Sequence, residues 1–134
     1  MTTFAQLLTI PVTEEFRINL KTDGSDLPEL PVLIMRRPET KEHARIQQRH
    51  EKVLLSFDEE RSGEYRFNHL GYACDMLKFV TGLEGADEPL DRDVLKHVFE
   101  RYEKIAIAFS NGIRKALQTL NECDLQQAET LRKN

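Results

Sequence analysis

A short apolar run that leads directly into a helix is the feature of this sequence that most limits how the chain can fold. Residues 32–35 are all apolar and have the composition of a β-strand, and Arg36, Arg37 and Pro38 follow them. Proline fixes φ near the helical value and has no N–H to lose, so it is tolerated in the first turn of a helix. The sequence therefore predicts a strand and a helix that are joined almost without a loop.

A second strand is predicted before this junction. Residues 16–21 alternate apolar with polar side chains, which is the period of a half-buried strand, and Asp23-Gly24 is a turn signal. Together the two runs predict an antiparallel β-hairpin over residues 15–37. Because an isolated hairpin is only marginally stable in water, we expect it to pack on helices.

Three later stretches, 39–57, 64–81 and 91–121, carry apolar residues at helical spacing. The second stretch is apolar on nearly all sides, which is typical of a central helix. We therefore expect its side chains at four positions to be buried: Phe67, Leu70, Cys74 and Leu77.

The third stretch begins with a clear signal and is unusually long. Asp91 is placed to cap its first turn, with Leu90 and Leu95 as a hydrophobic staple. The apolar phase continues through Gly112, which favours one helix of about thirty residues, about 45 Å long. A helix that breaks at Gly112 is the alternative.

These elements predict an α+β fold that is mainly α. An N-terminal antiparallel β-hairpin packs on a bundle of three principal helices, the last of which is long. A chain of 134 residues suits one domain, which we place at residues 1–121. Residues 122–134 are mostly polar and predict a flexible tail.

Composition argues for a cytoplasmic protein. Hydrophobic residues make up 40% of the chain and charged residues 31%, and no apolar run is long enough to suggest a membrane span or a signal peptide. The two cysteines, Cys74 and Cys123, fit a reducing compartment. Net charge is +3 over residues 36–57 and −6 over residues 58–93. We therefore expect the basic segment to face the acidic one or to form the solvent-exposed face of a helix.

No residue pattern predicts catalysis, a metal site or a cofactor. His43 and His50 share a helix face but lie two turns apart, which is too far for one metal ion. A histidine on an apolar stripe is more often a hydrogen-bonded core or interface residue, and His69 and His97 belong to no nucleophile motif. We expect a protein that is not an enzyme, binds no cofactor and does not use nucleic acid as its main partner.

The long last helix predicts a docking surface, because such a rod extends beyond what a small domain can cover. We expect self-association or partner binding on its apolar stripe and on the outward face of the strand at 32–37. The predicted contact residues are Leu33, Met35, Arg36, Arg37, Ile105, Phe109, Ile113 and Leu120.

The order of segments resembles a known family. The strand-to-helix junction at residues 34–42, the helix end at 79–85, the acidic turn at 86–90, the capped helix start at 91–99 and the Ile- and Ala-rich run at 105–109 carry the likeness. In this order they resemble the tail assembly chaperones of long-tailed bacteriophages.

The resemblance implies a helper protein without enzymatic activity. Such chaperones coat the tape measure protein in the cytoplasm of the infected bacterium until tail tube protein polymerises around it, and they are absent from the mature virion. The resemblance thus implies the tape measure protein as partner, with the tail tube protein as a second one.

Two other interpretations remain open at this stage. A small phage or bacterial regulator could inhibit a host factor by surface contact, using the acidic segment 58–93 as a mimic of DNA. A nucleic-acid binder could use the basic helix at 36–57, and its affinity would then fall steeply with salt.

Overall fold

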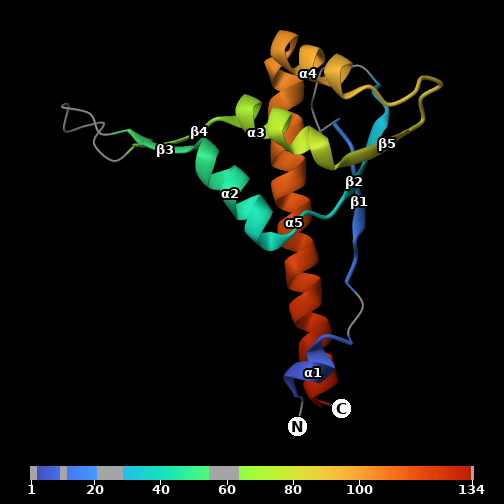
Figure 1. Cartoon of the computed structure of the whole chain (residues 1–134), viewed down its shortest axis with the longest axis vertical. Helices are drawn as coiled ribbons and strands as arrows, with labels where there is room; N and C mark the ends of the chain where they lie inside the picture. The colour runs from blue at the N-terminus through green and yellow to red at the C-terminus, as the bar shows by residue number, and fades with distance from the viewer. Residues whose placement is uncertain (1–2, 10–11, 21–28, 55–63, 134) are drawn as a thin grey trace.

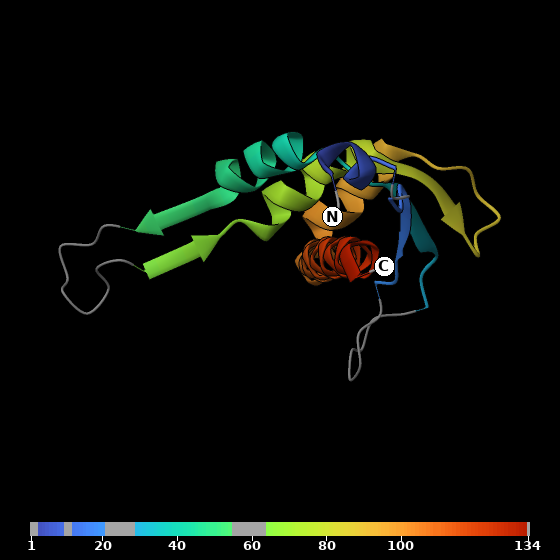
Figure 2. The ribbon, with the colours of Figure 1, turned by 90° about the horizontal axis from the view of Figure 1, so that it is seen from below.

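One long helix, α5 (Glu103–Lys133), is the axis on which the other elements pack in the computed structural model of the chain. The structure describes residues 3–9, 12–20, 29–54 and 64–133. Figure 1 shows the sheet and helices α2 to α4 around the N-terminal half of α5, while α1 (Phe4–Leu7) lies beside its C-terminal end. Figure 2, which looks along α5, shows the sheet on one side and a β-hairpin that projects on the other.

The predicted α+β fold, mainly α, is confirmed, but the sheet has one more strand than the predicted hairpin. Strands β1 (Glu15–Ile18) and β2 (Val32–Arg36) pair antiparallel as expected. Strand β5 (Val80–Glu84) pairs with the other edge of β2, also antiparallel, so that β2 is the central strand. The helix predicted over residues 64–81 includes residues 80 and 81, because they follow its apolar side chains without a break in the pattern.

The predicted helix over 39–57 is shorter than expected. Helix α2 (Thr40–His50) follows Pro38 closely, as predicted, but its C-cap residue Glu51 is extended, with φ −83° and ψ 131°. Residues 51–54 form strand β3 (Glu51–Leu54), which pairs with β4 (Glu64–Phe67). The neighbouring strand supplies the backbone hydrogen bonds that a longer helix would have supplied, and residues 55–57 lie outside the described residues.

The predicted helix over 64–81 is divided into four pieces. It begins as strand β4, continues as helix α3 (His69–Met76) and a short 3₁₀ turn, η2 (Leu77–Phe79), and ends in β5. Asn68 starts α3, because its side-chain oxygen accepts a hydrogen bond from the Gly71 N–H at 3.0 Å. Leu77 is buried as predicted, and the other three residues predicted to be buried are only partly buried against the core: Phe67, Leu70 and Cys74.

The predicted single helix over 91–121 breaks, but not at Gly112. Helix α4 (Arg92–Arg101) ends at Tyr102, whose φ of −123° and ψ of 83° are not helical, and α5 then runs without interruption to Lys133. The break turns α4 back, so that Phe99 packs on Phe109 with ring centroids 5.1 Å apart. Asp91 caps α4 as predicted, since its carboxylate accepts from the N–H groups of Asp93 and Val94.

The residues predicted to form a polar flexible tail, 122–134, belong to α5 as far as Lys133. The tail was expected because its apolar residues are sparse, yet the stretch 122–133 holds no proline or glycine that would end a helix.

The core is built where α5 meets α3, the sheet and α4. Its fully buried members include Phe109 and Ile113 of α5, Tyr72 and Met76 of α3, and Phe79 of η2. Gly112 permits the close approach of β1 to α5, because a Cβ at this position would stand only 3.1 Å from Cγ2 of Ile18.

Candidate functional site

Three of the four histidines join helices through hydrogen bonds, which confirms the interpretation of His43 and His50 as hydrogen-bonded residues. His43 Nε2 lies 2.6 Å from the Tyr72 hydroxyl, and His50 Nε2 lies 2.6 Å from a carboxylate oxygen of Asp75. His69 Nδ1 lies 2.9 Å from the hydroxyl of Ser110. Within the ranges that the structure describes, no group of three or more His, Cys, Asp or Glu side chains could hold a metal ion.

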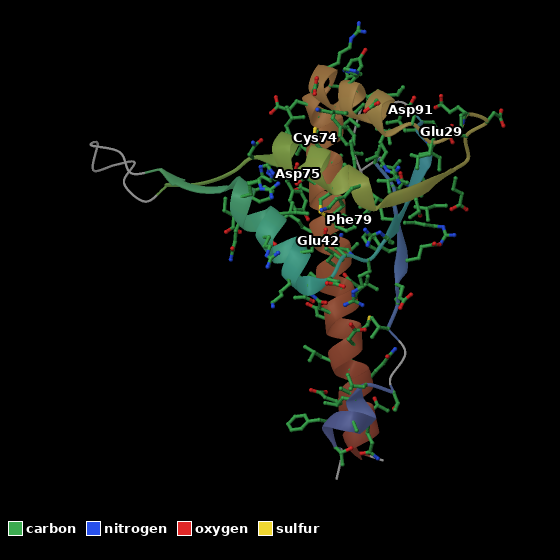
Figure 3. All side chains as sticks on the ribbon, in the orientation of Figure 1. Glu29, Glu42, Cys74, Asp75, Phe79 and Asp91 are labelled. Atoms are coloured by element: carbon green, nitrogen blue, oxygen red, sulfur yellow. The ribbon has the colours of Figure 1, made fainter. Side chains whose placement is uncertain are left out.

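Charged residues of α2 pair with α3 and η2. Asp75, labelled in Figure 3, accepts from Arg49 at 3.1 Å as well as facing His50, and Lys78 lies 2.6 Å from Glu42. The expectation that the basic segment 36–57 faces the acidic segment 58–93 is thus confirmed for Arg49 and Asp75. These pairs hold α2 against α3 and η2.

The predicted docking surface is wrong for five of its six apolar members. Leu33 and Met35 of β2 are 1% and 0% exposed, because β5 and the helices make this strand central and cover its inner face. On α5, Ile105, Phe109 and Ile113 are 6%, 0% and 0% exposed, because the chain folds back over this half of the helix. These five residues form the core and offer no surface to a partner.

The remaining predicted contact residues lie closer to the surface. Leu120 is half-buried and lines a groove between β1 and α5 with a volume of about 360 Å³. Arg36 is exposed, and its guanidinium lies 4.5 Å from the centre of the Phe79 ring.

Arg37 makes hydrogen bonds within the chain and is not free for a partner. Its guanidinium donates to the Thr13 carbonyl at 3.3 Å, to Asn121 Oδ1 at 2.7 Å and to a carboxylate oxygen of Asp124 at 2.7 Å. The side chain is only 14% exposed, and its hydrogen bonds connect the N-terminal segment to the C-terminal half of α5. The structure therefore gives Arg37 a supporting role in place of the predicted partner contact.

A larger groove runs between α2 and the C-terminal half of α5, and we call it the α2–α5 groove. Its volume is about 540 Å³. Helix α2 supplies two of its lining residues, and α5 supplies the other seven: His43, Gln47, Arg114, Lys115, Leu117, Gln118, Asn121, Glu122 and Leu125. Asn121 is held by Arg37, so the wall of the groove is fixed to the rest of the fold.

His43 and its partner Tyr72 are uncharged at the inner end of the groove, where Arg114 is the neighbouring charged group. Burial lowers the pKa of His43, and the nearby positive charge of Arg114 lowers it further, so the imidazole is neutral at pH 7. Burial raises the pKa of Tyr72 well above its usual value, so its hydroxyl keeps the proton and can donate to His43. The guanidinium of Arg114 lies 4.4 Å from the centre of the Phe67 ring.

Exposed apolar side chains are found at Leu125 in the groove and on helix α1, near the C-terminal end of α5. Leu125 lines the groove and is 67% exposed. Helix α1 lies beside the end of α5 and buries none of its residues, with Phe4 90% exposed and Leu8 88% exposed. Residues 1–13 contain no charged side chain. We call residues 3–9, which include α1, the N-terminal arm.

Sequence reasoning found His43 but missed the groove. The role of Arg114 in the groove was not predictable from its sequence neighbours. Its aromatic neighbour Phe67 lies in strand β4, in a stretch that was predicted to be helical. Leu125 was assigned to the tail, although its exposure follows from the continuation of α5 beyond the core. The absence of charge in residues 1–13 is the one sequence signal that could have pointed to this end of the molecule.

No helix in the described part of the chain has both the length and the hydrophobicity to cross a membrane. No protein family model matches the sequence, and no curated protein or solved structure matches the chain. The resemblance to tail assembly chaperones therefore stays a prediction.

Proposed function

We propose that this protein is a tail assembly chaperone of a long-tailed bacteriophage, without enzymatic activity, that binds the tape measure protein and keeps it soluble. It acts in the cytoplasm of the infected bacterium and leaves before the virion is mature. The observation that carries the proposal is a groove between two helices that is lined by the exposed Leu125, together with the exposed apolar side chains of the N-terminal arm.

A tape measure protein is long and helical, so it presents apolar helix stripes that aggregate in water. A groove between two helices can accept the apolar face of such a helix. The exposed Leu125 lines the groove, and the N-terminal arm, with Phe4 and Leu8 exposed, lies near the C-terminal end of α5. Because most of this surface is open in the free chain, tail tube protein can displace the chaperone without unfolding it.

The alternatives receive less support from the described residues. Two acids of the segment 58–93 are already paired, Asp75 with Arg49 and Glu84 with Arg17, so they do not add to a continuous DNA-like face. In the basic segment, Arg37 and Arg49 are paired with Asp124 and Asp75, which reduces the charge available for phosphates.

Co-expression with the tape measure protein of the same phage tests the proposal. We expect the tape measure protein to stay soluble and to purify with this chain in a fixed ratio. Phe4→Asp combined with Leu8→Asp should reduce the yield of the complex, because it places two charges in an apolar contact.

Val94→Asp is the matched control. Val94 is 53% exposed on α4, which lies at the opposite end of α5 from the N-terminal arm. A tape measure protein that remains insoluble beside the unaltered chain would contradict the proposal and would favour the regulator. Deletion of the gene should leave infected cells with assembled heads and no tails.

A further inference from the structure

Arg114 differs from three other arginines of the fold, each of which pairs with a carboxylate. Arg17, Arg37 and Arg49 lie within 2.6, 2.7 and 3.1 Å of Glu84, Asp124 and Asp75. Arg114 makes no ion pair with any side chain that the structure describes. Its guanidinium carbon lies 4.4 Å from the centre of the Phe67 ring. It is half-buried in the wall of the α2–α5 groove.

The groove around Arg114 does not neutralise its charge. The neighbouring His43 and His69 are neutral, because burial and Arg114 itself lower the pKa of each. Lys115, the next residue of α5, adds a second positive charge to the lining. Glu122 is the one acid among the described residues that line the groove, and it lies eight residues further along α5, about 12 Å at 1.5 Å per residue.

A planar guanidinium that is already packed on an aromatic ring is well prepared to bind a carboxylate. The ring fixes one face of the group and leaves its N–H edges free to donate, so little rotamer freedom is lost on binding. A half-buried site also strengthens the attraction between the two charges relative to one in open water.

We propose that the α2–α5 groove binds a helix that carries an acidic side chain, and that this carboxylate pairs with Arg114 while apolar side chains of the same helix pack on Leu125. The inference rests on the proposed function and specifies the chemistry of the segment that the chaperone recognises. The positive end at Arg114 and Lys115 and the negative end at Glu122 give the groove a polarity. The bound helix therefore places its acidic side chain toward the core of the chaperone.

Overlapping peptides that cover the tape measure protein test this inference, with binding to the full chain measured by fluorescence anisotropy. The tightest-binding peptide is also made with its acidic residue replaced by lysine. We expect Arg114→Glu to weaken binding of the first peptide by about tenfold or more, and Arg114→Gln by several-fold. Arg114→Glu should bind the lysine peptide better than the unaltered chain does.

Lys104→Glu is the matched control, since it makes the same change of charge at an exposed position near the start of α5. Circular dichroism establishes that each variant is folded, and the exchanged peptide tests Arg114→Glu by a gain of binding. Equal losses for Arg114→Glu and Lys104→Glu would overturn the inference, because they would indicate general electrostatics.

The remaining outcomes are also distinguishable. If peptides bind the unaltered chain and Arg114→Glu equally well, the proposed contact between Arg114 and a carboxylate of the bound helix is wrong, and the proposed function stands. If neither the peptides nor the full tape measure protein binds the unaltered chain, both fail. A homodimer that Arg114→Glu dissociates would identify a second copy of this chain as the occupant and would overturn the proposed partner.

Discussion

Replacing Phe109 by alanine tests whether this residue contributes to the stability of the core, in contrast to the residues of the proposed binding surface. Phe109 is fully buried on α5, and its ring packs on that of Phe99. A buried phenylalanine removes about 150–250 Å² from water, which at about 25 cal/mol/Å² is worth about 4–6 kcal/mol. Because alanine keeps part of this contact, we expect Phe109→Ala to lower the free energy of unfolding by about 4 kcal/mol.

Urea unfolding followed by far-ultraviolet circular dichroism measures this loss. The midpoint should fall while the slope with urea stays the same, and the melting temperature should fall by about 12 °C, at about 3 °C per kcal/mol. Leu125→Ala is the comparison, since Leu125 is 67% exposed and should change the free energy of unfolding by less than about 0.5 kcal/mol. A loss below about 1 kcal/mol for Phe109→Ala, or equal losses for the two variants, would refute the assignment of Phe109 to the core.

Three further predictions concern pH, a glycine and an arginine. Since the pKa values of His43 and His69 are lowered in the fold, the unfolded chain binds more protons, and the free energy of unfolding should fall as pH drops below about 6.5. Gly71→Ala should cost about 1–3 kcal/mol in urea unfolding, because the new Cβ would stand 2.6 Å from the ring of His50. Arg37→Met should cost about 2 kcal/mol and speed hydrogen exchange near residues 12–14 and 121–124, because it removes three hydrogen bonds to other segments.

Each of these predictions has its own control. His43→Gln should make the free energy of unfolding less dependent on pH between 5.5 and 8, a range above the titration of the carboxylates; an unchanged slope would contradict the role of His43. Gly112→Ala should cost less than Gly71→Ala, since its Cβ would meet Ile18 at 3.1 Å; a reversed order would contradict the packing. Arg36→Met, at an exposed position, should leave hydrogen exchange near Asp124 unchanged.

The elements that were predicted correctly are those whose signal is local. The β1–β2 hairpin follows from alternation within each strand, and the starts of α2 and α4 follow from Pro38 and Asp91. Strand β5 was missed because its partner β2 lies nearly fifty residues earlier in the chain. Residues 51–54 fit a helix and a strand equally well by their apolar spacing, and only their pairing with β4 decides between the two.

The binding surface was harder to predict than the fold. An apolar stripe does not reveal which neighbour will cover it, and the break at Tyr102 brings Phe99 of α4 onto Phe109 within the same chain. Hydrogen bonding of His43 and His50 was predictable because polar groups on an apolar face need partners. The lack of an ion pair between Arg114 and any described side chain was not predictable, since it depends on which acids the fold brings near.

The position of α5 after all the other helices and strands has a consequence for synthesis on the ribosome. Phe109, Ile113 and Leu117, which belong to the core, are translated after the sheet and helices α2 to α4. Until they emerge, the inner faces of the sheet and of α3 lack the helix against which they pack, so we expect these elements to stay unfolded until α5 has been made. A stop codon shortly before residue 105 should therefore yield an insoluble fragment, whereas one after residue 125 should leave the core intact.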